Sequence, residues 1–272
     1  MADRLPLILI PPSEGKAVGG TGEPWVPGAG SFPSLDPFRA RVQRSLGAAM
    51  KTRLSERQKL LGVKGAALAL ATTTNLAVRT SATSPAIERY TGVLYDALDA
   101  ASLSKRDRLR LDQQVIIFSG LWGLVRPTDP IPDYKLKMGA TLKATGRLAS
   151  YWKPRIDAAM GSELVDRTVW NLLPNEHDSA WSGAAAAAAV VSVRFLDEVG
   201  TGSHTKLIVV SHWNKLLKGA LVRHVLAHQL ADVDGLADFE HPEGYSYRPD
   251  LTVASTTDRG GNQIAVSLVA RR

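Results

Sequence analysis

Short, uninterrupted apolar runs that stop at polar or proline-rich loops constrain the fold of this chain more than any other feature. Leu5 to Ile10 ends at Pro11-Pro12, and Val115 to Phe118 ends at a serine and a glycine. Runs of this length are typical of strands buried in a sheet. Further strands are predicted at 170–173, 190–195 and 207–210, and a terminal hairpin at 250–256 and 262–268, around Asp258 to Gly261. Helical spacing of apolar residues at 38–50, 55–61 and about 214–230 completes the pattern of an α/β fold.

The composition excludes several classes of protein. Of the 272 residues 44% are hydrophobic and 22% charged, which is enough apolar material for a sizeable core. No cysteine occurs, so disulfides, thiolate metal sites and cysteine nucleophiles are excluded. No apolar run is long enough for a membrane span or a signal peptide, so we expect a cytoplasmic protein without a membrane partner.

The net charge favours an anionic partner. Lysine and arginine exceed aspartate and glutamate by 33 − 26 = 7, a balance common in proteins that bind nucleic acid or nucleotides. Solubility alone would also explain a charge of this size, so the clustering of the cations decides between the two interpretations.

A polar loop follows the first predicted strand. Ser13-Glu14-Gly15-Lys16 places a hydroxyl, a carboxylate, a glycine and a cation where α/β folds often bind ligands. Ser13 and Lys16 are therefore candidate phosphate ligands, although the spacing of a P-loop is absent. A simple polar turn is the alternative. The glycine- and proline-rich stretch from Gly19 to Pro37 predicts an irregular connection or a flap.

The loop after the second strand is the richest in candidate ligands. Arg126, held before a proline, and Lys135 supply cations, and Asp133 supplies a carboxylate. Trp122 and Tyr134 supply aromatic faces on which a base could stack.

Residues 55–78 resemble a helix-hairpin-helix element. Gly62-Val63-Lys64-Gly65 lies between two apolar helical segments, and such turns present backbone N–H groups and a helix N-terminus to phosphates. Lys64 would lie in the turn. The spacing is Gly-x-x-Gly rather than the tighter Gly-x-Gly, so an ordinary corner between two helices is the alternative.

The last predicted helix carries Lys215, Lys218 and Arg223 at spacings that bring them near one face. This stripe could contact phosphates, or it could be a solvated face. His224 and His228 have the spacing of two metal ligands, but no third ligand is evident. We expect no metal and no cofactor.

Polar residues also follow the predicted strand at 170–173. Asn171, Asn175 and Glu176 come at or after its end, and Glu240 lies in a later polar cluster. Because loops at the ends of strands converge in α/β folds, we expect these residues to share one cleft with the loops after the first two strands.

Several segments together resemble the YaaA, or peroxide stress protein, family. They are 8–16, 90–95, 119–127, 134–138, 151–152, 170–176, 195–198, 215–223 and 244–245, and they cover nearly the whole chain in order. The resemblance implies one mixed α/β domain over 1–272, with a helix-hairpin-helix-like element and a basic cleft. It also implies a cytoplasmic DNA-binding protein that protects against peroxide and iron-driven DNA damage. Ser13-Glu14-Gly15-Lys16 departs from the Ala-Lys-Thr-Leu of better-known members, as do Trp122 and 175–177, where they commonly have Tyr and Asp-Glu-Tyr.

Two functions from different classes follow from these residues. In the first, the cations of the cleft bind the phosphates of DNA and the aromatic residues stack on bases. In the alternative, the protein is a metal-independent hydrolase that cleaves the N-glycosidic bond of a nucleotide and releases a purine-type base. Glu14, Glu176 or Glu240 would then activate water. Direct iron binding is disfavoured because soft ligands are lacking. A monomer is favoured, and the sequence leaves the oligomeric state open.

Overall fold

The computed structural model describes residues 5–183, 186–200, 205–210, 214–256 and 261–272. Within these residues nine strands form a central sheet, in the order β11-β13-β9-β8-β1-β3-β4, with β10 paired to β9 and β12 to β13. The strands are β1 (Leu7–Ile10), β3 (Val115–Ser119), β4 (Gly123–Val125), β8 (Thr168–Asn171), β9 (Ala189–Val199), β10 (Lys206–Val209), β11 (Ser246–Tyr247), β12 (Val253–Thr256) and β13 (Asn262–Arg271). The sheet confirms the mixed α/β class.

The middle of the sheet is parallel and buried. β1 pairs in parallel with β3 on one side and with β8 on the other, and every residue of β1 and β3 is buried. Unbroken apolar sequences suit strands that are covered on both faces. β9 continues the parallel arrangement between β8 and β13, whereas β4 folds back antiparallel to β3.

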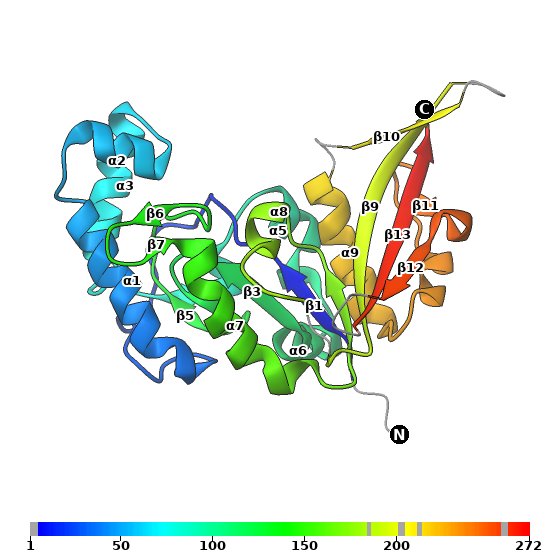
Figure 1. Ribbon diagram of the computed structural model, residues 1–272, viewed down its shortest axis with the longest axis horizontal. Helices are drawn as coiled ribbons and strands as arrows, with labels where there is room; N and C mark the ends of the chain where they lie inside the picture. Colours follow the sequence, from blue (N-terminus) through cyan, green and yellow to red (C-terminus); the bar gives the residue numbers. More distant parts are fainter. Residues whose placement is uncertain (1–4, 184–185, 201–204, 211–213, 257–260) are drawn as a thin grey trace.

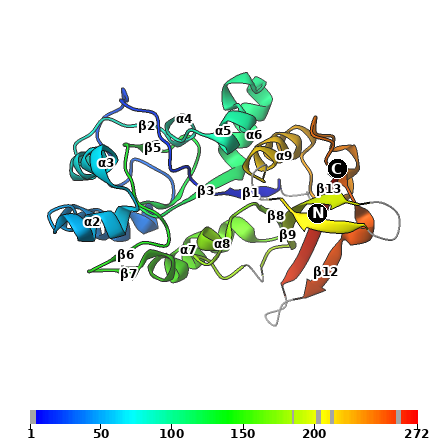
Figure 2. The same cartoon turned by 90° about the horizontal axis from the view of Figure 1, so that it is seen from above.

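Helices cover both faces of the sheet (Figure 2). On one side lie α5 (Val93–Leu98), α6 (Lys105–Gln114) and α9 (Asn214–His228), and on the other lie α7 (Leu148–Leu164) and α8 (Asn175–Asp178). Ser104 caps α6, its Oγ accepting from the N–H of Asp107 at 3.1 Å.

A helical group occupies the end of the molecule away from β10 and β13 (Figure 1). It consists of α1 (Asp36–Ala49), α2 (Leu54–Leu61) and α3 (Gly65–Ala77). The remaining elements are short: α4 (Ala86–Arg89) and the two-stranded pairs β2 (Ser84–Pro85) with β5 (Pro130–Ile131) and β6 (Thr141–Leu142) with β7 (Gly146–Arg147).

Most strand boundaries agree with the apolar runs, and the differences have local causes. β8 is Thr168–Asn171 rather than 170–173, because its pairing with β9 begins at Thr168 and ends at Asn171, and the apolar Leu172 and Leu173 are buried beyond the strand. The terminal hairpin is confirmed by the pairing of β12 with β13, although 258–260 of its expected turn lie outside the described residues. No single helix in the described part of the chain is long and apolar enough to cross a membrane; α2 and α3 reach that length only together, at an angle of 86°.

The order of the strands creates a crevice beside β1. The chain runs from β1 to β3 on one side, and then passes to β8 and β9 on the other. Ligands of open α/β sheets bind outside the carboxyl ends of strands at such a switch point. In this chain the crevice lies between the loops that follow β1 and β8.

Candidate functional site

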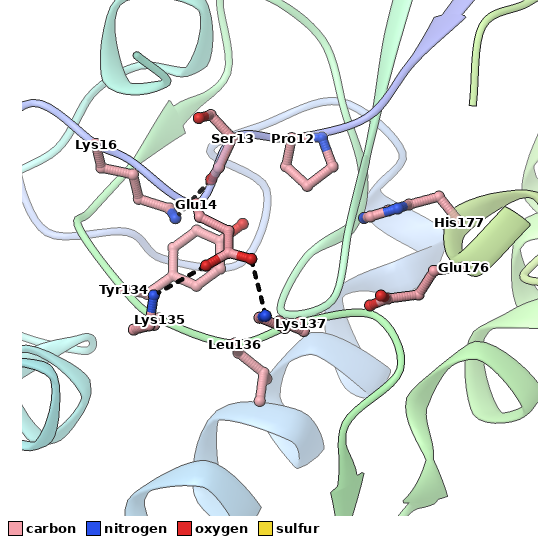
Figure 3. A pocket seen from close by; sticks show the side chains of 10 residues that line it. All are labelled: Pro12, Ser13, Glu14, Lys16, Tyr134, Lys135, Leu136, Lys137, Glu176 and His177. Atoms are coloured by element: carbon pink, nitrogen blue, oxygen red, sulfur yellow. Dashed lines mark hydrogen bonds and ion pairs between the residues drawn. The ribbon is translucent and has the colours of Figure 1, made fainter. Parts of the chain in front are cut away.

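A small pocket of about 70 Å³ occupies this crevice (Figure 3). Three segments contribute to it: the loop after β1, the segment after β5 and the start of α8. The lining residues are Pro12, Ser13, Glu14, Lys16, Tyr134, Lys135, Leu136, Lys137, Glu176 and His177. The structure thus brings together Ser13, Glu14, Lys16, Tyr134, Lys135 and Glu176 of the residues expected to share a cleft.

The loop after β1 is fixed by backbone hydrogen bonds to the segment before α5. The N–H of Ala17 donates to the carbonyl of Arg89 at 2.8 Å, and the N–H of Thr91 donates to that of Gly15 at 3.1 Å. Gly92, with φ +102°, lies directly against the Ser13 hydroxyl, where a side chain would be both strained and crowded. The loop is therefore held by residues about 75 positions away.

The guanidinium of Arg89 ties this loop to the segment after β5. Arg89 is fully buried and donates to the carbonyls of Ala17, Gly19 (2.7 Å) and Ile131 (3.2 Å). Buried charges persist where their donors are used in this way. Arg89 consequently links the loop after β1 to the end of β5, three residues before Tyr134.

Residues 134–137 cross over the end of β3. A β-carbon on Gly120 would lie 2.7 Å from the carbonyl carbon of Lys137, so the crossing depends on glycine at this position. The Tyr134 hydroxyl lies 2.7 Å from both Ser119 Oγ and the Tyr90 hydroxyl. This buried hydroxyl chain fixes the floor of the pocket.

Glu14 occupies the centre of a lysine pair. Its carboxylate contacts Lys137 Nζ at 2.9 Å and Lys135 Nζ at 3.3 Å. The hydrogen bond from Lys137 is the main cause of the lowered pKa of Glu14. Burial raises this pKa, and the hydrogen bond from Lys135 lowers it further. The Glu14 side chain is 64% exposed, so it can leave. Glu14 thus fills the space between the two lysines.

Lys16 lies deeper in the same pocket. Its Nζ donates to the carbonyl of Ser13 at 3.0 Å and stands 4.2 Å from the centre of the Tyr134 ring. Burial lowers the pKa of Lys16 to about 8. The ring face of Tyr134 is therefore covered by this ammonium group.

Glu176 and His177 form the opposite wall at the start of α8. The N–H of Gly139 donates to Glu176 Oε1 at 2.6 Å, which fixes that carboxylate. His177 Nδ1 is buried and has no hydrogen-bond partner within the described part of the chain, and burial lowers the pKa of His177 to about 4. The imidazole is therefore neutral at neutral pH.

A second, wider hollow adjoins the pocket through Glu176. It measures about 590 Å³ and contains Asn175, Lys215 and Lys218 among its lining residues. Lys218 Nζ donates to the carbonyl of Leu172 at 2.8 Å, and burial lowers the pKa of Lys218 to about 8. Of the expected stripe on α9, two lysines face this hollow.

The turn between α2 and α3 lies beside the pocket. The two helices meet at 86°, with φ +67° at Gly62 and +57° at Gly65. A β-carbon on Gly62 would lie 4.0 Å from Lys137 Nζ. Lys64, which directly precedes α3, is exposed. The bend between α2 and α3 therefore lies next to the lysine pair.

The expectation of one cleft is wrong for Trp122 and Arg126. Trp122 is fully buried against Trp25, with ring centres 5.1 Å apart, so it cannot stack on a base. Since β4 runs back along β3, Arg126 reaches the opposite end of the sheet. There it donates to the carbonyl of Gln113 at 2.6 Å and pairs with Glu163 at 2.9 Å.

Four further candidates lie outside the pocket lining. Arg223 donates to the carbonyl of Leu98 at 2.7 Å and thereby binds the end of α5. The Nδ2 of Asn171 donates a hydrogen bond to Oδ1 of Asp178 at 2.8 Å, which links the end of β8 to α8. Asp133 is half-buried and acts on Lys16 only through its charge. Glu240 is exposed in a loop before β11.

Two polar lining residues, Lys137 and His177, were not among the residues expected to share the cleft, although Lys137 is one of the cations of the loop after the second predicted strand. Lys137 is two positions from Lys135, and alternate residues of an extended segment share one side, so this spacing was an available signal. His177 carried none. The described residues contain no cluster of three or more His, Asp or Glu side chains that could hold a metal.

Comparison with known proteins identifies the family. The family model described as peroxide stress protein YaaA matches residues 7–251. A UPF0246 protein of Streptomyces coelicolor is 38% identical over 81% of this chain and 83% of its own length. A UPF0246 protein of Corynebacterium glutamicum is 36% identical over 85% of this chain and 91% of its own length. One of Roseobacter denitrificans is 33% identical over 65% of this chain and 68% of its own length. The chain is therefore a member of the YaaA (UPF0246) family of peroxide stress proteins.

Proposed function

We propose that this protein binds DNA through the phosphate backbone and that this binding serves protection against peroxide. The observation that carries the proposal is the position of Lys137 beside the Gly62 turn, where a β-carbon on Gly62 would lie 4.0 Å from the lysine Nζ, because two candidate phosphate-binding features are thereby neighbours. One feature is the α2–α3 turn with Lys64, and the other is the lysine-lined pocket.

The turn can bind a phosphate without reading a base. The first N–H groups of a helix lack intrahelical partners, and the helix dipole favours an anion there. α3 has 13 residues and no acidic side chain in its first turn, so nothing in that turn competes with a phosphate. Contacts of this kind are independent of sequence.

The pocket can bind a second phosphate when Glu14 leaves. Lys135 and Lys137 are already spaced around one carboxylate, at 3.3 and 2.9 Å. Since a phosphate carries more charge and more acceptor oxygens than a carboxylate, it can replace Glu14 between them. A duplex bound at both places would make the affinity depend steeply on salt.

The peroxide role rests on the family. The family description names peroxide stress, and shielding of DNA from oxidants is a function that a backbone-binding surface can serve. Such a role would place the protein in the cytoplasm, where its DNA partner lies.

The test compares Lys64→Ala, Lys137→Ala and the double variant for binding of a fluorescent duplex by anisotropy. Each single variant should weaken binding several-fold, and the double variant more than either. Lys206→Ala, which removes one exposed charge from β10, serves as the control. If both single variants bind like Lys206→Ala, the surface is not the DNA site.

A second candidate function is favoured by the carboxylates of the pocket. Glu14 and Glu176 line the same small space as three lysines, and a backbone-binding site has little use for carboxylates. In a nucleotide hydrolase the lysines would hold the phosphate while a carboxylate activates water at the N-glycosidic carbon. Chromatography of nucleotides incubated with wild type, Glu14→Gln and Glu176→Gln tests this function. Release of free base that one of these variants abolishes would establish it.

A further inference from the structure

One of the three pocket lysines has no salt-bridge partner among the residues that the structure describes. Lys135 and Lys137 both pair with Glu14, whereas Lys16 makes no salt bridge with any described residue. Its Nζ instead donates to the carbonyl of Ser13 and lies over the rings of Tyr134 and Tyr90, at 4.2 and 5.5 Å. The amine thus lies over the Tyr134 ring, among the side chains that line the pocket (Figure 3).

We propose that Lys16 is a nucleophile that forms an imine with the aldehyde group of a phosphate-bearing ligand. For an aldehyde carried by nucleic acid, such as the sugar of an abasic site, this proposal rests on the proposed DNA binding. For a free sugar phosphate it does not.

The surroundings of Lys16 favour the neutral amine, which is the reactive form. Burial is the largest cause of its lowered pKa of about 8, and the nearby charges of Lys135 and Arg89 lower it further. Asp133 and Glu14 act in the opposite direction. At pH 8 about half of the Lys16 side chains are uncharged, whereas an ordinary lysine is almost fully protonated at that pH.

The reaction needs no co-reactant. The Nζ lone pair forms a bond to the carbonyl carbon, and one Nζ proton passes to the carbonyl oxygen, giving a carbinolamine. The hydroxyl group of the carbinolamine then leaves together with the second Nζ proton, as one molecule of water, and the C=N bond remains. A neutral His177 and a carboxylate, Glu176, line the same pocket and can carry protons in these steps.

The pocket also indicates the class of ligand. Its volume of about 70 Å³ accepts only a few water-sized groups, which suits an aldehyde whose remaining atoms stay outside the pocket. The phosphate would then lie at the mouth, between Lys135 and Lys137, in the place of Glu14. The ligand is therefore an aldehyde with a phosphate a few bonds away.

Borohydride trapping tests the proposal, because it reduces an imine to a stable amine. The full-length protein is incubated with a duplex containing one abasic site, and separately with 2-deoxyribose 5-phosphate, and the adducts are mapped by peptide mass spectrometry. Lys16→Arg keeps the positive charge but cannot form the imine. Lys206→Arg on β10 is the control. Anisotropy of the same duplex without borohydride reports binding separately.

We expect the trapped adduct on Lys16. Its yield should fall at least about tenfold in Lys16→Arg and should not fall in Lys206→Arg. An adduct only with the duplex assigns the aldehyde to nucleic acid, and one only with the sugar phosphate assigns it to a small molecule. Adducts spread over other lysines, or equal in Lys16→Arg, would overturn the proposal. Binding of the duplex without any adduct would overturn it too, while leaving DNA binding intact. Mapping in the wild type decides the matter even if Lys16→Arg fails to fold.

Discussion

Replacement of Glu14 by glutamine should tighten the binding of a phosphate-bearing ligand. An anion that uses Lys135 and Lys137 must displace the Glu14 carboxylate, which contacts them at 3.3 and 2.9 Å. An exposed ion pair contributes roughly 0.2–1 kcal/mol. Displacing Glu14 from both lysines therefore costs about 0.4–2 kcal/mol. Because about 1.4 kcal/mol corresponds to a tenfold change in affinity, Glu14→Gln should bind roughly 2- to 30-fold more tightly.

Fluorescence anisotropy of a labelled duplex at low salt measures this change. Glu23→Gln is the matched control, since Glu23 is an exposed glutamate outside the pocket lining and its loss changes the net charge equally. The gain should shrink as salt rises, because exposed charges are screened. Equal or weaker binding by Glu14→Gln, relative to Glu23→Gln, would refute the reasoning that Glu14 stands in for an anion.

Other predictions concern the pocket and its support. Binding of an anion should weaken as pH rises through about 8, because Lys16 and Lys218 then lose their charge; anisotropy at pH 7 and 9 checks this, and Lys16→Arg should lose part of the dependence. Gly120→Ala should lower the free energy of unfolding by about 1–3 kcal/mol, since its β-carbon would meet the Lys137 backbone at 2.7 Å. Urea denaturation measures this loss, and unchanged stability would contradict the close packing of residues 134–137 on Gly120. His177 has a folded-state pKa of about 4, below the usual 6.5, so the unfolded chain binds the extra proton first and stability falls as pH drops from about 6.5 to 4. In His177→Asn the stability should decrease less over this pH range, as measured by urea denaturation at several pH values. A pH profile identical to that of the wild type would contradict the role of His177.

The parts of the fold that the sequence predicted correctly are those in which one local pattern suffices. β1 and β3 are continuous apolar runs that only a buried strand accommodates. The site loop Ser13 to Lys16 was predicted for the same reason, since the loop after a central strand lies at the crevice.

The errors arise where long-range pairing decides the position of a residue. Arg126 belongs to the same polar segment of the sequence as Lys135, but the antiparallel return of β4 places it at the other end of the sheet. Trp122 lies in the turn between β3 and β4 and packs into the core. The role of Arg89 could not be inferred either, because its acceptors at Gly19 and Ile131 lie 70 and 42 positions away.

The salt dependence of duplex binding tests the central claim most directly. Each phosphate that the protein neutralises should contribute about −0.9 to the slope of log Kobs against log salt concentration. Because Lys135 and Lys137 share one phosphate, we predict that Lys135→Ala and Lys137→Ala each reduce the slope of the wild type by at most about one unit, whereas Lys206→Ala leaves it unchanged. A wild-type protein without measurable duplex binding, or equal slopes in all four proteins, would contradict a lysine pocket that binds the phosphate backbone.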